Sequence, residues 1–281
     1  MKNRIKFAGH TMGAPDCDIY QAIELFKKIG YDGLEVRVAP NGQINSETIT
    51  DEEVLKIRDA ARTAGIEIAC LTSYYKDFVT PEVRPVTIAN LKRVAEIAAL
   101  LECPLIRLYG GVEPYVMQKV WFCDVWSRSV TGAREVAEYA GNLGVDICVE
   151  THVGSLTMSV RDTVRFVQDV GMSNVGILLD YAWVELAGVE HGAEAVRLAA
   201  PYLKHVHVKD WTLETRTPLK KVSALMGKGT VDWKPVLAEL GKVGYSGYIC
   251  DEYEKYWYPD ELPSTEEGMT HNLNFVRDNL G

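Results

Sequence analysis

One pattern recurs along the chain: apolar residues at helical spacing lead into a glycine, and a short β-rich run begins within a few residues. Val54, Ile57 and Ala61, for example, precede Gly65 and the run IEIACL. A glycine just past a helix commonly takes the left-handed conformation that caps the last carbonyl groups, so each one predicts a helix end. The predicted helix ends of this kind are Gly30, Gly65, Gly144, Gly171 and Gly244.

The pattern extends to eight units, each a strand followed by a helix. Further helices are predicted from Ile88 to near Pro104, over 190–200 and over 266–280, and the run IKFAGH supplies the first strand. Dividing 281 residues by eight gives about 35 per unit, which is enough for a strand, a helix and two loops.

Strand candidates such as VGILLD are continuously apolar, which suits a parallel sheet covered on both faces. Alternating strands and helices leave two architectures, a closed barrel or an open doubly wound sheet. Eight units favour closure, and no G-x-G-x-x-G follows the first strand, where a dinucleotide fold needs it. We therefore predict an α/β protein: a single (β/α)8 TIM barrel forming one domain over 1–281, since no linker rich in Pro, Gly or Ser divides the chain.

Composition narrows the classes of partner. The chain has 30 Lys and Arg against 39 Asp and Glu, a net charge of −9, so it lacks the basic surface that a binder of nucleic-acid backbone needs. No apolar run approaches the roughly 18 residues that cross a bilayer, and the start has no signal-peptide pattern. The six cysteines show no C-x-x-C spacing and are expected to be buried and reduced. We expect a cytoplasmic protein without nucleic-acid or membrane partners.

Four consecutive units end in polar residues that can bind a metal ion. Glu150 ends ICVE, Asp180 ends VGILLD, His207 lies near the end of HVHVKD, and Glu252 ends GYICDE. In a β/α barrel the carboxyl ends of the strands form the active site, so these side chains can converge. Three carboxylates and one imidazole suit one divalent ion such as Mn²⁺, Mg²⁺, Co²⁺ or Zn²⁺. The alternative is four unrelated groups that cap strands or form salt bridges.

Several motifs carry a family resemblance: CVETH (148–152), ILLD (177–180), HVHVKD (205–210), GKGTVDW (227–233) and GYICDEYE (247–254). With these motifs the second half of the chain resembles the xylose-isomerase-like barrels, which include sugar isomerases and epimerases, inosose dehydratases and abasic-site endonucleases. The resemblance implies that Glu150, Asp180, His207 and Glu252 bind one catalytic metal. The H-x-x-D spacing from His207 to Asp210 favours His207 over His205 as the ligand.

This resemblance implies an isomerase or epimerase that acts on a keto-sugar or keto-polyol through a metal-stabilised enediolate, with Glu150 and Glu252 as the catalytic proton carriers. Dehydration begins with the same proton removal. A dehydratase or lyase acting on an inosose or 3-keto-sugar derivative is therefore the alternative, with His152 assisting the leaving group as a further catalytic residue. A non-catalytic sugar-binding barrel also stays open, whereas an endonuclease would need more histidines and a basic groove. Relatives are often dimers or tetramers, which implies a homodimer or homotetramer.

Other residues are expected to face a sugar or polyol substrate. Many relatives have a His three residues after the Asp ligand, but this chain has Trp183 there, and an indole cannot relay a proton. Glu35 and Arg37 in GLEVR, together with Arg107, are expected at the mouth, where they bond to substrate hydroxyls or pair with one another. The substrate-binding candidates are Trp183, Lys209, Arg107, Trp211 and Tyr253.

Overall fold

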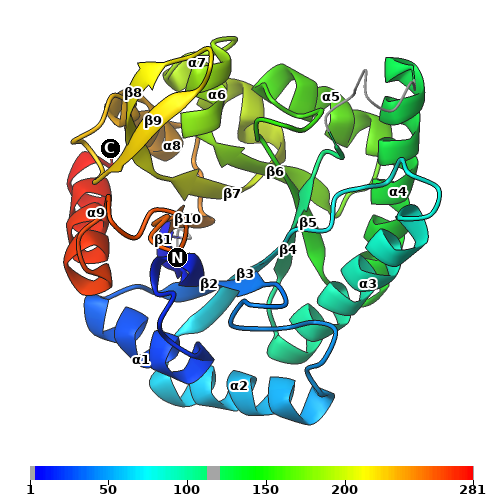
Figure 1. The fold of residues 1–281 in the computed structure, drawn as a ribbon, viewed down its shortest axis with the longest axis horizontal. Coiled ribbons are helices and arrows are strands. Elements are labelled where there is room, and N and C mark those ends of the chain that lie inside the picture. The colour runs from blue at the N-terminus through cyan, green and yellow to red at the C-terminus, as the bar shows by residue number, and fades with distance from the viewer. Residues whose placement is uncertain (1–3, 113–120, 281) are drawn as a thin grey trace.

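Eight parallel strands close into a barrel in the computed structural model, which describes residues 4–112 and 121–280 (Figure 1). Around the barrel the strands follow the order β1-β10-β7-β6-β5-β4-β3-β2. The predicted α/β barrel of eight strand and helix units is therefore confirmed. The strands are β1 (Lys6–His10), β2 (Gly33–Val38), β3 (Glu67–Ser73), β4 (Leu105–Tyr109), β5 (Asp146–Glu150), β6 (Val175–Asp180), β7 (Leu203–Val208) and β10 (Tyr248–Asp251).

Helices form a ring outside the barrel (Figure 1). They pack apolar faces against the outer face of the strands, which explains why both faces of strands such as β2 and β6 are buried. The α-helices are α1 (Ile19–Ile29), α2 (Asp51–Ala64), α3 (Arg84–Leu101), α4 (Phe122–Asn142), α5 (Val160–Val170), α6 (Tyr181–Ala187), α7 (Ala193–Ala199), α8 (Trp233–Lys242) and α9 (Thr265–Asn279), with short 3₁₀ turns η1 (Thr11–Gly13) and η3 (Ala200–Tyr202).

The helix ends follow the glycine pattern. Gly30, Gly65 and Gly171 are the C-caps of α1, α2 and α5, and each has a left-handed backbone conformation. Gly144 and Gly244 have positive φ one residue beyond the C-caps of α4 and α8. These glycines end the helices because their lack of a Cβ permits the conformation that satisfies the last carbonyl groups.

An antiparallel hairpin between β7 and α8 was not predicted. It consists of β8 (Asp210–Thr215) and β9 (Lys220–Ala224) and lies outside the barrel sheet (yellow in Figure 1). The following Gly-rich turn folds onto the first residue of the hairpin, since the backbone N–H groups of Gly227 and Gly229 donate to Asp210 Oδ2 at 2.9 and 3.0 Å. These amide groups thus bind a carboxylate of the chain itself.

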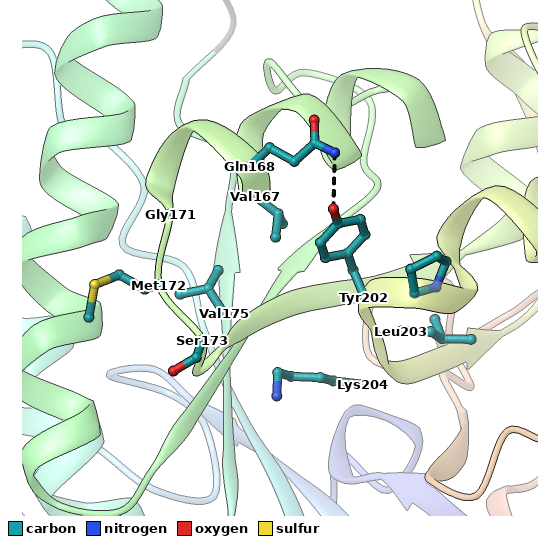
Figure 2. A pocket seen from close by; sticks show the side chains of 10 residues that line it. Val167, Gln168, Gly171, Met172, Ser173, Val175, Tyr202, Leu203 and Lys204 are labelled. Atoms are coloured by element: carbon teal, nitrogen blue, oxygen red, sulfur yellow. Dashed lines mark hydrogen bonds between the residues drawn. The ribbon is translucent and has the colours of Figure 1, made fainter.

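Hollows lie at the end of the barrel where the strands begin. One of about 530 Å³ is bounded by the end of α5 and the start of β6 and β7, and Figure 2 shows its lining, with Gln168 Nε2 donating to Tyr202 Oη at 3.0 Å. This position is remote from the carboxyl ends of the strands, where a barrel places its chemistry. Within 4–112 and 121–280, no helix is both long and apolar enough to span a bilayer.

Candidate metal centre

The four predicted ligands meet at the carboxyl end of the barrel. Glu150, Asp180, His207 and Glu252 are all buried, and one ligand atom from each lies within 4.8 Å of those of the other three. The strand register explains the convergence, because Asp180 on β6 is level with His207 on β7, and Glu252 directly follows β10, the other neighbour of β7. Residues separated by whole β/α units therefore form one cluster.

Basic side chains balance the three carboxylates in this structure. His207 Nδ1 lies 3.4 Å from Glu150 Oε1 and from Glu252 Oε2. The Lys209 ammonium lies 2.7 Å from Asp180 Oδ2 and also donates to Glu252, and Arg107 donates to Glu150. The cluster therefore requires positive charge close to its acids, which is the charge that a divalent cation would provide.

Burial and these partners move the pKa values of the acids in different directions. Burial raises the pKa of Asp180 to about 7 despite the nearby Lys209. Burial would also raise the pKa of Glu252, but Lys209 and His207 hold it well below its usual range. The pKa of Glu150 is likewise lowered against the effect of burial, chiefly by Arg107. Both glutamates are therefore ionised near neutral pH.

Three ligand atoms fit a bound ion, because two have no hydrogen-bond partner in the described structure and the third, Asp180 Oδ2, contacts the Lys209 ammonium at 2.7 Å in an ion pair that a metal can replace. Glu150 Oε1 and His207 Nδ1 are buried and have no hydrogen-bond partner among the described residues. Buried polar atoms are normally paired, so two unpartnered atoms beside these carboxylates mark a place that a cation fits. Two ligands on a tetrahedral zinc ion lie about 3.3 Å apart, close to the 3.4 Å between His207 Nδ1 and each glutamate oxygen. The oxygen-rich donor set suits Mn²⁺, Mg²⁺, Co²⁺ or Zn²⁺.

Glu35, Arg37 and Arg107 form no ion pair with one another, which was one of the two arrangements expected for them. Glu35 lies inside the barrel, where it accepts hydrogen bonds from His205 and His207. Arg37 bonds to Asn41, and its guanidinium carbon lies 4.0 Å from the Tyr256 ring centroid. Arg107 donates hydrogen bonds to Glu150 and to a backbone carbonyl, so it contacts one of the four proposed metal ligands. The family motifs pointed to the ligands but gave no indication of these partners.

The predicted substrate-binding residues divide into two groups. Trp183 on α6 lies beside the cluster, with its ring centroid 4.8 Å from Lys209 Nζ, 4.7 Å from the Trp211 ring and 5.0 Å from the ring of His152. The buried Trp183 Nε1 has no hydrogen-bond partner in the described part of the chain. A substrate hydroxyl can satisfy that donor.

Lys209 and Tyr253 differ from expectation. Lys209 is buried against the acids, since its ammonium contacts Asp180 and Glu252. The Tyr253 hydroxyl donates to Pro263 O at 2.9 Å, in the loop before α9, so the structure gives no support to its expected substrate contact. Because the chain turns toward α9 directly after β10, the Tyr253 side chain lies against the loop before α9.

Comparison with known proteins agrees with this architecture. The sequence is 27% identical to the D-psicose 3-epimerase of Agrobacterium fabrum over 241 residues, 82% of this chain and 77% of that protein. An inosose dehydratase of Yersinia enterocolitica is 26% identical over 163 residues, 53% of this chain and 54% of the relative. The crystal structure of a D-psicose 3-epimerase in the presence of D-fructose superposes with a TM-score of 0.81, covering 99% of this chain and 100% of the other at 22% identity.

The sequence profile described as xylose isomerase-like TIM barrel matches residues 23–279, which spans most of the described barrel. The profile match includes every strand but the first and all four proposed ligands. The chain therefore belongs to the xylose isomerase-like TIM barrel family.

Proposed function

We propose that this protein is a divalent-metal-dependent epimerase or isomerase of a keto-sugar or keto-polyol. The observation that carries the proposal is the convergence of Glu150, Asp180, His207 and Glu252, with Glu150 Oε1 and His207 Nδ1 buried and unpartnered among the described residues. The relatives that match over most of the chain, D-psicose 3-epimerases, support a ketose as substrate. The proposed ligands are these four residues, and the candidate ions are Mn²⁺, Mg²⁺, Co²⁺ and Zn²⁺.

A divalent ion in this site would polarise the ketose carbonyl and its neighbouring hydroxyl, which acidifies the proton on the carbon between them. Glu150 and Glu252 are the proposed proton carriers. A glutamate that takes this proton must start ionised, and Arg107 and Lys209 hold the two carboxyls in that form. Proton delivery to the opposite face of the same carbon gives an epimer, whereas delivery to the neighbouring carbon gives an isomer.

Substrate recognition is assigned to the aromatic side of the site. Trp183 and Trp211 offer flat apolar faces that suit the carbon-bound hydrogens of a sugar, and the free Trp183 N–H suits a hydroxyl. His152 lies beside Trp183, with the two ring centroids 5.0 Å apart. Burial lowers the pKa of His152, so its imidazole is neutral and acts through hydrogen bonds.

A dehydratase acting on an inosose or 3-keto-sugar is the second candidate, and the inosose dehydratases that match about half of the chain support it. Elimination needs a protonated group to accompany the departing hydroxyl as water. Lys209 is held in its charged form beside the cluster, since its acidic partners keep its pKa well above the usual value against the effect of burial. A pKa so far above neutral makes Lys209 a weak acid, so His152 keeps the role of assisting the leaving group in this alternative.

An exchange experiment in D₂O separates the candidates. The protein is treated with EDTA, reloaded with Mn²⁺, and incubated with D-fructose, D-psicose and an inosose while NMR spectra are recorded. Deuterium at the carbon next to the carbonyl together with an epimer or isomer supports the leading proposal. An unsaturated product supports the dehydratase. If the Mn²⁺-loaded protein binds these compounds but exchanges no hydrogen, the enzyme proposal is wrong and the barrel only binds sugar.

The location and the assembly belong to the same proposal. A cytoplasmic location is supported by the six free cysteines, since disulfides are rare in reducing compartments. A homodimer or homotetramer is supported by Trp121 and Phe122, two exposed aromatic residues at the start of α4 of the kind that subunit interfaces cover. Light scattering tests the assembly: a mass of 31.3 kDa would exclude it.

A further inference from the structure

A second cluster of metal-binding residue types lies deeper in the barrel. It contains Glu35 on β2, His205 and His207 on β7, and Cys250 on β10, all buried. Glu35 Oε2 lies 2.6 Å from His205 Nε2, and Glu35 Oε1 lies 2.8 Å from His207 Nε2. Because β1 and β10 separate β2 from β7 in the barrel, the Glu35 side chain crosses the interior to reach the two rings.

The spacing in this deeper cluster indicates hydrogen bonds and excludes a second ion between these atoms. Ligands on a tetrahedral zinc ion lie about 3.3 Å apart, whereas the two contacts of Glu35 are at hydrogen-bond distance. An ionised carboxylate only accepts hydrogen bonds. The nitrogen of each histidine that faces Glu35 therefore carries the proton.

This assignment determines the state of the other nitrogen of His207. A histidine binds a metal as the neutral imidazole, which has one N–H; with that N–H donated from Nε2 to Glu35, Nδ1 offers its lone pair to the ion. His207 Nδ1 is the atom that lies 3.4 Å from Glu150 and Glu252 without a partner among the described residues. His205 bonds to the second oxygen of Glu35 and thereby fixes the plane of its carboxylate.

We propose that Glu35 is a positioning residue that holds His207 in the tautomer and orientation needed to bind the catalytic ion through Nδ1, with His205 as the anchor of Glu35. The proposal rests on the metal centre of the proposed function. Carboxylates that bind the far nitrogen of a ligand histidine typically change metal affinity by 10- to 100-fold. Glu35 reaches no other proposed ligand, so its effect passes through His207.

The test is the affinity for Mn²⁺, measured by the EPR signal of the free ion, in the wild type and in Glu35→Gln. The glutamine side chain has nearly the same shape but presents an N–H to one of the two histidines, so we expect binding to weaken by about 10- to 100-fold. The visible absorption of the Co²⁺ complex, which reports ligand geometry, shifts as well. Unchanged affinity and an unchanged Co²⁺ spectrum overturn the proposal.

A matched control is Glu67→Gln on the neighbouring strand β3. Glu67 lies at the other end of the barrel, bonded to Lys6 and Tyr248, so its loss should leave both readouts at the wild-type value. If Glu67→Gln weakens Mn²⁺ binding as much as Glu35→Gln, the effect is a general loss of structure and the positioning role is overturned. If the wild type binds neither Mn²⁺ nor Co²⁺, the proposed metal centre itself is wrong, which distinguishes the two failures.

A measurement on the wild type decides the matter if Glu35→Gln does not fold. Long-range ¹H–¹⁵N spectra of ¹⁵N-histidine-labelled, Zn²⁺-loaded protein report which ring nitrogen carries the proton. The proposal requires His207 to show a protonated Nε2 and a zinc-bound Nδ1. A protonated Nδ1, or zinc on Nε2, overturns it.

Discussion

The Lys209 ammonium lies 2.7 Å from Asp180 Oδ2 and also donates to Glu252, so two of the proposed metal ligands share one buried lysine. The same carboxylates are therefore available either to an internal cation or to an added one. This relationship makes the stability of the protein depend on its ion in a measurable way.

Replacing Lys209 with methionine tests that dependence. Without metal, Lys209→Met leaves buried carboxylates without their cation, and we expect a loss of about 3–5 kcal/mol in the free energy of unfolding. Saturating Mn²⁺ should recover more stability in the variant than in the wild type, because no ammonium competes for the ligands. Urea titrations in EDTA and in Mn²⁺ provide the measurement. The exposed Lys28→Met should cost less than about 1 kcal/mol in both, and an equal loss with and without Mn²⁺ would contradict the shared-ligand interpretation.

Glu252→Gln removes one proposed proton carrier while keeping the shape of the side chain. We expect turnover at saturating Mn²⁺ to fall by about 10²- to 10⁴-fold, the usual contribution of a general base. The measurement is the rate of deuterium incorporation into the ketose. Glu266→Gln, a half-exposed acid that pairs with Lys28, serves as the control and should retain full activity. Activity of Glu252→Gln close to that of the wild type would remove Glu252 from the mechanism.

Two tryptophans form a matched pair for substrate binding. Trp183 Nε1 is buried without a partner in the described structure, whereas Trp233 Nε1 donates to Lys209 O at 2.9 Å. Trp183→Phe should raise KM by about 3- to 10-fold without loss of stability, because its N–H is available for substrate. Trp233→Phe should instead destabilise the fold by about 1–3 kcal/mol and leave KM unchanged. Initial-rate kinetics and thermal unfolding distinguish them, and an unchanged KM in Trp183→Phe would place the substrate elsewhere.

Asp251 gives a prediction for the pH dependence of stability. Burial raises its pKa from 3.8 to about 7, even though Tyr31 and Asn272 donate hydrogen bonds to it. The folded state therefore keeps a proton that the unfolded chain loses above pH 4. The contribution of Asp251 is complete below that pH, decreases as pH rises to about 7, by at most about 1.4 kcal/mol per unit, and then stays constant.

Asp251→Asn isolates this contribution. Asparagine fits the same space, since Tyr31 can accept a hydrogen bond from the amide while donating to Met269 O. Urea midpoints of the wild type and the variant are compared from pH 4 to pH 8. We expect the stability of the wild type relative to the variant to fall across that window, and a difference independent of pH would show that Asp251 does not titrate there.

The sequence was sufficient for the barrel because its signals are local. The helix end at Gly65, for example, depends on one residue and its neighbours. The continuous apolar run of β6 follows from burial of both faces of the strand. The ligands followed from the barrel together with the family motifs, since the carboxyl ends of the strands of a β/α barrel gather around one site. Glu150 and Asp180 were predicted for that reason.

The contacts that could not be predicted from the sequence depend on how deep a side chain lies in the barrel and on where the chain turns after a strand. Glu35 and His205 lie 170 positions apart, and whether Glu35 faces the mouth or crosses the interior depends on strand tilt. Each strand of the β8–β9 hairpin alternates over only two apolar positions, Trp211 and Leu213 in β8 and Val222 and Ala224 in β9, which are too few to identify a strand. Lys221 within it is buried against Glu254 at 3.0 Å, a pairing that only the folded hairpin creates.

The hairpin and the strand ends supply different parts of the candidate site. The four proposed ligands come from the barrel strands or the residue directly after β10, whereas Lys221, 4.7 Å from the Trp211 ring, comes from an appendage outside the sheet. Mutations in the β8–β9 hairpin can therefore accumulate without disturbing the barrel strands that hold the proposed metal ligands. A lineage that lengthens or recharges this hairpin can acquire new substrates while inheriting the old chemistry intact, which makes it a natural target for laboratory evolution.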